Sequence, residues 1–124
     1  MSDPIFVPKR LWYKSFALLP QEAIYVVIDA ADNLGFGLAV AEITKSDPHC
    51  HKITKETYTL IAGQLWVHIE GQVTLLKKPG ESIQIPVGTI HWAESADPEN
   101  PALISVLTTP AWTSNDYILV DWPY

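Results

Sequence analysis

The side chains of this chain best suited to chemistry are three of its four histidines and one glutamate. His49 and His51 are two residues apart, a spacing that puts both side chains on the same face of a β-strand. Glu56 opens the next expected strand, and His91 follows the turn-forming segment 86–88. Three neutral imidazoles and one carboxylate suit a divalent first-row transition metal. An octahedral ion held by these four groups would keep coordination positions for water, substrate or dioxygen.

The segments that must position these residues have the pattern of short strands rich in β-branched and aromatic residues. Turn signals recur every 8 to 12 residues or so, which is typical of an antiparallel sandwich or barrel. Residues 10–19 fit either a short helix or a strand. The expected strands are 23–31, 36–44, 57–61, 64–69, 72–76, 82–85, 90–95, 103–109 and 117–120.

Length and composition narrow the possible functions. A chain of 124 residues with 48% hydrophobic residues fits one domain with one core. Its 14 acidic against 8 basic residues give a net charge of −6, so we expect no nucleic-acid or membrane-surface partner.

The apolar runs are shorter than the roughly 18 residues of a membrane span. The N-terminus lacks the apolar core of a signal peptide, and Cys50 is the only cysteine, so we expect a cytoplasmic protein.

The spacing of these residues resembles two conserved motifs of the cupin superfamily. The pattern His49-x-His51-x4-Glu56-x6-Gly63 is similar to the first motif, and Gly80-x5-Pro86-x-Gly88-x2-His91 is similar to the second. Three positions depart from the family pattern without removing a ligand. Ile43 stands where the first motif usually begins with glycine, and Glu81 stands where the second motif commonly has aspartate after Gly80. Ser95 stands where an asparagine often follows the last histidine.

The resemblance implies an all-β fold, a single-domain antiparallel jelly-roll β-barrel. It implies one divalent transition metal inside the barrel, drawn from Fe, Mn, Ni, Co, Cu or Zn. The implied metal ligands are His49, His51, Glu56 and His91. The positions expected to serve structural turns are Gly63, Gly80, Pro86 and Gly88.

Strand alternation extends the expected site beyond the metal ligands. Tyr58 shares the face of Glu56 and is a candidate for proton transfer, with a core tyrosine as the alternative. His68 is a second candidate, although no motif includes it and a structural or solvated histidine is the alternative. The side chains expected to line the pocket are Leu60, Ile83, Ile85 and Ala93.

These features favour a metal-dependent enzyme acting on a small, weakly charged organic molecule. Either iron(II) supports dioxygenase-type oxidation, or a divalent ion acts as a Lewis acid in isomerase, cyclase or lyase chemistry. Arg10 is the only arginine, and the scarcity of basic residues disfavours a phosphosugar substrate. The alternative is a non-catalytic metal-containing barrel that binds a small ligand. A structural protein with a vestigial site is a third possibility, against which the intact ligand set argues.

The chain divides into an N-terminal arm, residues 1–22, and the barrel, residues 23–124. Cupins commonly pair through sheet faces or exchange N-terminal strands, and residues 1–13 of this chain include several large apolar side chains. We therefore expect a homodimer in which the arm contributes a strand to the partner.

Overall fold

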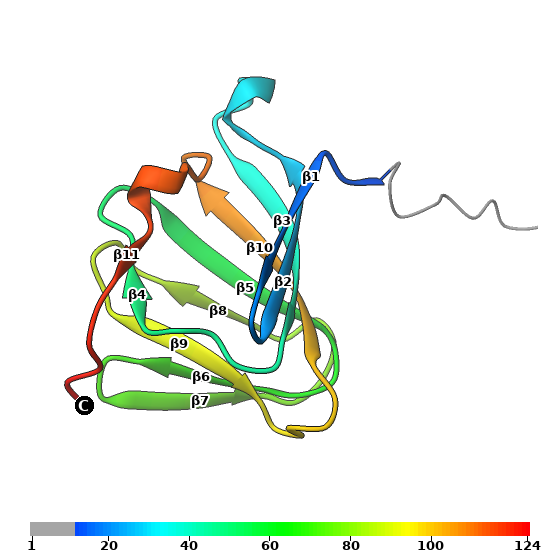
Figure 1. Ribbon diagram of the computed structural model, residues 1–124, viewed down its shortest axis with the longest axis vertical. Coiled ribbons are helices and arrows are strands. Elements are labelled where there is room, and N and C mark those ends of the chain that lie inside the picture. The colour runs from blue at the N-terminus through cyan, green and yellow to red at the C-terminus, as the bar shows by residue number, and fades with distance from the viewer. Residues whose placement is uncertain (1–11) are drawn as a thin grey trace, which may run out of the picture.

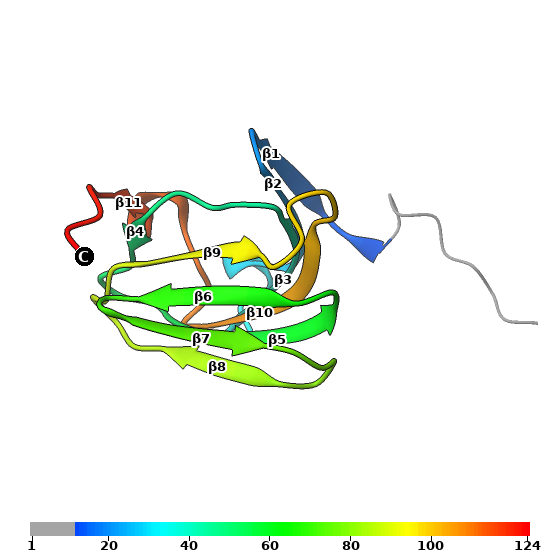
Figure 2. The same cartoon turned by 90° about the horizontal axis from the view of Figure 1, so that it is seen from below.

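Two antiparallel β-sheets face each other in the computed structural model, which describes residues 12–124. Figures 1 and 2 show the sheets as opposite walls of a barrel. This confirms the predicted all-β antiparallel barrel. One sheet contains, in spatial order, β1 (Ser15–Leu19), β2 (Glu22–Ile28), β3 (Gly37–Ile43), β10 (Ala102–Thr109), β5 (Lys55–Ala62) and β8 (Ser82–Ile85). The other contains β11 (Ile118–Leu119), β4 (His49–Cys50), β9 (His91–Ser95), β6 (Leu65–Ile69) and β7 (Gln72–Leu76). Two single 3-10 turns are η1 (Ala30–Asp32) and η2 (Ser114–Asp116).

Alternating burial explains how the sequence forms these strands. Along β5, Glu56, Tyr58 and Leu60 are buried, whereas the threonines between them are half-buried. Successive side chains of a strand point to opposite faces, so each strand offers one set of residues to the space between the sheets. The core formed there consists of Ala41, Ile43, Tyr58, Leu60, Leu65, Val67, Leu76, Ile85, Ala93, Ala102 and Ile104.

In the segment that fitted either a helix or a strand, Ser15–Leu19 is a strand. β1 pairs with β2 from Ser15↔Val26 to Leu19↔Glu22, so the proposed boundary after residue 22 falls inside a β-hairpin. The side chains of Phe16 and Leu18 are 55% and 71% exposed on this edge strand. Residues 1–11 of the expected arm lie outside the described part of the chain, so strand exchange in a homodimer stays a prediction.

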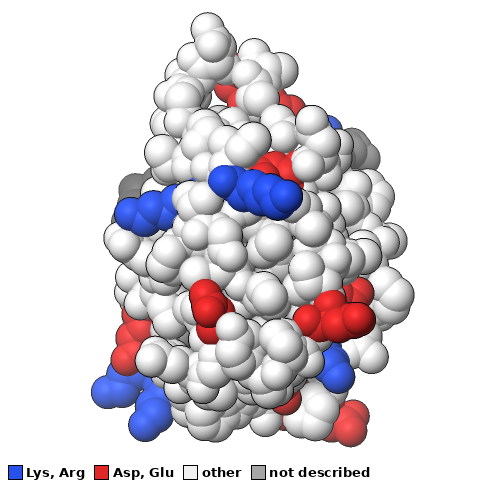
Figure 3. All heavy atoms as spheres, turned by 90° about the vertical axis from the view of Figure 1, so that its left-hand side faces the viewer, with Lys and Arg blue, Asp and Glu red and all other residues white. Residues whose placement is uncertain are grey.

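Charged side chains of both signs lie on the surface. On the face shown in Figure 3, basic and acidic side chains are interspersed among uncharged atoms. Among residues 12–124, no helix has the length and apolar character that crossing a membrane requires.

The glycines expected at turns adopt backbone conformations that favour glycine. Gly63, Gly80 and Gly88 have φ angles of +78°, +94° and +80°. At Gly63, a Cβ atom would also lie 3.2 Å from Ala102 Cα on the neighbouring β10, whereas at Gly80 nothing lies within 4 Å. Gly63 therefore serves both the turn before β6 and close packing of the sheet.

We expect Gly63→Ala to lower the free energy of unfolding by about 1–3 kcal/mol, because it combines a strained φ with a tight backbone contact. Gly80→Ala is the matched control, since it introduces the strained φ without the contact. Urea unfolding of both variants measures the difference. Equal losses in the two variants would contradict a packing role for Gly63.

Candidate metal centre

The four predicted ligands come from both sheets and meet between them. His49 lies on β4 and pairs directly with His91 on β9 in the five-stranded sheet. His51 follows β4 immediately, and Glu56 lies on β5 in the facing sheet. One ligand-capable atom from each residue lies within 4.8 Å of the others, and all four residues are at least 94% buried. The residues therefore form a buried group that is consistent with one metal ion.

Backbone carbonyl groups fix the orientation of all three imidazoles. The Nδ1–H groups of His49, His51 and His91 donate to the carbonyl oxygens of Asp47, Asp116 and Thr89, at 2.7, 2.7 and 3.0 Å. A carbonyl oxygen can only accept a hydrogen bond, so Nδ1 carries the proton in each ring. A neutral ring of this tautomer presents the Nε2 lone pair, and such outer hydrogen bonds are typical of metal-bound histidines.

The centre of the group is electron-rich and incompletely satisfied. Nε2 of His51 and Nε2 of His91 lie 3.1 and 3.0 Å from Oε1 of Glu56. The His51 contact lacks hydrogen-bond geometry, so this buried nitrogen has no hydrogen-bond partner among the described residues. A buried polar atom without a partner is costly, and a cation at the centre would satisfy it together with the carboxylate. The residues therefore fit a divalent metal ion.

The protonation states of the ligands also favour positive charge at this centre. Burial by itself would raise the pKa of Glu56, but the ring nitrogens of His51 and His91 lower that pKa to about 2. Burial lowers the pKa of His49 to about 4. Burial likewise lowers the pKa of His51, but the Glu56 carboxylate more than offsets this, and the pKa is raised. At neutral pH the carboxylate is charged and His49 is neutral, which are the forms that bind a metal ion.

A buried aspartate that the sequence analysis missed supports the ligand loop. The Asp116 carboxylate accepts hydrogen bonds from the backbone N–H groups of Lys52, Ile53 and Thr54, at 2.8 to 3.3 Å. The backbone oxygen of the same residue accepts the Nδ1–H of His51. η2 therefore holds both the loop that joins two ligands and the ring of one of them. No local signal marks this aspartate, because its partners are more than 60 residues away.

A backbone hydrogen bond ties the turn of the second motif to the ligand segment of the first. The N–H of Gly88 donates to the carbonyl oxygen of His51 at 2.7 Å. In the same turn, the Thr89 hydroxyl donates to the Pro86 carbonyl at 2.7 Å. The carbonyl of Thr89 then accepts from His91, so the turn expected at Pro86 and Gly88 aligns the fourth ligand.

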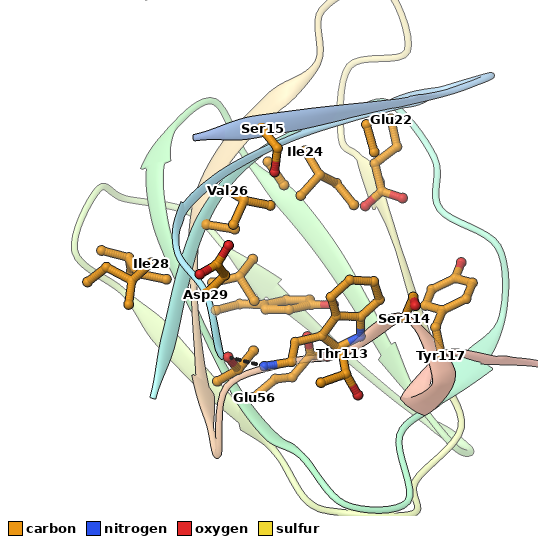
Figure 4. A pocket seen from close by; sticks show the side chains of 18 of the residues that line it. Ser15, Glu22, Ile24, Val26, Ile28, Asp29, Glu56, Thr113, Ser114 and Tyr117 are labelled. Atoms are coloured by element: carbon orange, nitrogen blue, oxygen red, sulfur yellow. Dashed lines mark hydrogen bonds between the residues drawn. The ribbon is translucent and has the colours of Figure 1, made fainter. Parts of the chain in front are cut away.

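A cavity of about 360 Å³ adjoins the centre, and His49 and Glu56 form part of its wall (Figure 4). Much of the remaining wall is apolar and comes from β2, β3 and Trp112. Its volume is within the range of sites for small organic molecules. An ion held by the four ligands would therefore be accessible to a small molecule in this cavity.

A few polar side chains interrupt the apolar wall. Tyr58 lines the cavity beside Glu56, as strand alternation predicts, and its ring centroid is 6.2 Å from that of His91. The ring of Tyr117 stacks on His49 with a centroid distance of 4.6 Å. Glu22 lies on the β2 wall, with its carboxylate directed into the cavity (Figure 4). Burial raises the pKa of Glu22 to about 7, with smaller contributions from the carboxylates of Glu56 and Asp47.

Several expected site residues lie elsewhere. The four side chains expected to line the pocket are not part of the wall of this cavity, which is on the β2–β3 side of the metal ligands. They belong to the hydrophobic core or pack against it. The four residues are Leu60, Ile83, Ile85 and Ala93. His68 stacks on Trp92 at 3.9 Å on the face of the sheet opposite Ala93 and His91, and its Nε2 lies 3.0 Å from Glu94. Strand alternation therefore keeps it from transferring protons at the centre.

Comparison with known proteins gives a fold and no close relative. No family model matches the sequence, and no curated protein matches it. Solved structures do match. The oxalate decarboxylase of Lactobacillus farciminis, in a formate complex, has a TM-score of 0.73 and 14% identity over 86% of this chain and 33% of that one.

Two further solved structures also match most of this chain. A conserved protein with a double-stranded β-helix domain from Klebsiella pneumoniae has a TM-score of 0.70 and 19% identity, over 96% of this chain and 99% of that one. The cupin domain of Schizosaccharomyces pombe Cnp3 has a TM-score of 0.66 and 12% identity, over 78% of this chain and 69% of that one. At these identities the likeness is one of fold.

We expect Asp116→Ala to weaken metal affinity about ten- to hundredfold although all four ligands remain, because His51 and its loop lose their support. Competition with a chromogenic chelator measures the affinity. Asp97→Ala is the control, since Asp97 accepts hydrogen bonds within a different, exposed loop. Unchanged affinity in a folded Asp116→Ala protein would show that η2 does not position the ligands.

Replacement of Glu22 should change the pH dependence of stability. An unfolded glutamate ionises near pH 4.5 and the folded Glu22 near pH 7, so the folded protein holds the extra proton and loses stability as pH rises through this range. We expect metal-free Glu22→Gln to be more stable than wild type by about 1–3 kcal/mol at pH 8. At pH 5 the difference should fall to about a quarter of its value at pH 8. Denaturant unfolding at both pH values, with exposed Glu99→Gln as control, tests this; a gain at pH 5 as large as at pH 8 contradicts it.

Proposed function

We propose that this chain, which has the cupin fold with a buried group of three histidines and one glutamate, is a divalent-metal-dependent enzyme. Its substrate is a small, largely apolar organic molecule. One observation carries the proposal: a cavity of about 360 Å³ has two of the four ligand residues in its wall. A purely structural metal site is closed by its ligands, whereas a catalytic site keeps a position open to substrate.

The four ligands would hold the ion, and the ion would supply Lewis acidity toward a substrate oxygen or, as iron, a site for dioxygen chemistry. The chain supplies the rest. The apolar side chains of β2 and β3 exclude water and orient the body of the substrate. The Tyr58 hydroxyl, the Tyr117 hydroxyl and the Glu22 carboxyl are the polar groups that can hold or move a proton beside it.

The protonation states in the cavity favour Lewis-acid chemistry with proton transfer. Burial raises the pKa of Tyr58 well above its usual value and that of Tyr117 to about 12, so both phenols stay protonated and act as hydrogen-bond donors. Glu22, with a pKa of about 7, can give or accept a proton at neutral pH. The oxalate decarboxylase of the same fold supports enzymatic activity on a small organic molecule.

We expect purified untagged protein to contain, or to take up, about one divalent transition metal ion per chain, because the four ligand atoms converge on one centre. The double variant His49→Ala, His91→Ala should lose that metal. Plasma mass spectrometry measures it. His68→Gln is the matched control, because this fourth histidine lies on the opposite face of the sheet and should leave the metal content unchanged.

Absence of metal in the wild-type protein after reconstitution with each divalent ion would overturn the proposed function. Activity screens of the metal-loaded protein then test the two proposed kinds of reaction. Oxygen uptake with small aromatic and diketone substrates tests oxidation, and proton exchange or isomerisation of small carbonyl compounds tests Lewis-acid catalysis. Binding of such compounds with no turnover in any screen would instead identify a non-catalytic ligand-binding barrel.

A further inference from the structure

The charges around the cavity have one sign. Glu22 and Asp29 line it together with the ligand Glu56, and among residues 12–124 no lysine or arginine lines it. Asp29 is balanced, because Lys14 Nζ lies 3.3 Å from its carboxylate at the rim. The carboxylate of Glu56 faces the proposed metal ion. Within the described part of the chain, Glu22 is therefore the acidic group of the wall that neither a basic side chain nor the ligand set balances.

The position of Glu22 follows from its strand. Glu22, Ile24, Val26 and Ile28 alternate along β2, and all four line the cavity. The sequence thus places one carboxyl group on an otherwise apolar strand face. Figure 4 shows this carboxyl directed into the cavity, beside Ile24 and on the same side of the view as Tyr117. A molecule that reached the metal ligands would share the cavity with it.

We propose that Glu22 determines ligand charge at this site: it restricts the cavity to uncharged molecules and admits an anion only together with a proton. This rests on the proposed function, because it concerns the ligand that reaches the metal centre. A charged Glu22 repels an anion across an apolar space that screens charge poorly, whereas a protonated Glu22 donates a hydrogen bond to it. To the proposed function, the inference adds the charge class of the substrate and the residue that determines it.

Of the titratable groups named around the cavity, Glu22 is the one whose ionisation changes near neutral pH. Asp47 and Glu56 act on it as negative charges and favour its protonated form. Tyr117 and Tyr58, from the C-terminal segment and β5, keep their protons, and His49 on β4 is neutral. A divalent ion at the centre adds positive charge and shifts the titration of Glu22 to lower pH. A test must therefore span the range from about pH 5.5 to about pH 8.5.

The test uses cobalt(II)-loaded protein, whose visible absorption reports ligands that enter the coordination sphere. Butanoate is the anionic probe and pyridine is the neutral probe, both with small apolar bodies. The measured quantity is the ratio of their dissociation constants as a function of pH. Hydroxide binding to the metal weakens both probes alike and cancels in this ratio, whereas the charge of Glu22 affects only the anion.

In the wild-type protein we expect butanoate to weaken relative to pyridine by about tenfold or more as pH rises across this range. Glu22→Gln should give a ratio that does not change with pH and stays at the low-pH wild-type value. Glu22→Asp should keep the pH dependence because it keeps the charge, and exposed Glu99→Gln should behave as wild type. Cobalt content of each protein establishes that the centre is intact.

A ratio that changes with pH equally in wild type and Glu22→Gln overturns this inference, and so does a ratio that is constant in the wild type. Both results leave the proposed metal-dependent function standing. Protein that takes up no cobalt overturns the proposed function and this inference together, and the metal content makes that outcome distinguishable from the other two.

Discussion

The burial of one carboxylate, that of Glu56, constrains how the groups around the centre are placed. Glu56 is 6% exposed and lies between the sheets, where an uncompensated charge costs several kcal/mol. The nearest polar atoms are imidazole nitrogens, and the outer nitrogen of each ring is committed to a backbone carbonyl. The inner nitrogens can compensate the carboxylate only through a shared cation, whether a proton or a metal ion. The strands that carry these groups must therefore hold them in register.

That register depends on contacts between segments far apart in the chain. The loop between His51 and Glu56 has its backbone N–H groups bound by Asp116, and the turn before His91 is tied to the carbonyl of His51. The ring of His51 is thus oriented by a distant residue, Asp116, whereas His49 and His91 are each oriented by a carbonyl two residues before them. The pairing of β4 with β9 and of β5 with β10 then fixes the place of these strands within their own sheets.

The sequence predicts the strands and the ligand set well for a physical reason. Short strands with one buried face produce a period of two, and the ligand spacing on them is local, so His49, His51 and Glu56 can be assigned without tertiary information. The location of the cavity cannot be assigned this way, since it depends on how β2 and β3 lie over the ligands. Leu60 shares a strand face with the ligand Glu56, yet it packs in the hydrophobic core and does not line the cavity.

Glu22 and Asp116 show two ways in which a functional residue escapes such analysis. Glu22 did have a local signal, a charge on the apolar face of β2, but its meaning appears only when the cavity is known. Asp116 had none, because its role is to bind backbone groups more than 60 residues away. Residues 10–19 were ambiguous because β1 is exposed along its whole length and lacks alternation of burial.

The walls of the cavity and the ligands of the centre are carried largely by different strands. β2 and β3 supply much of the apolar lining, whereas β4, β5 and β9 carry three ligands and His51 follows β4 directly. Substitutions at Ile24, Val26 or Leu38 can reshape the lining without touching a ligand or the carbonyl that orients it. Natural selection can therefore alter what this barrel accommodates while its inorganic chemistry is conserved, so descendants of one ancestral barrel can diversify in substrate faster than in metal.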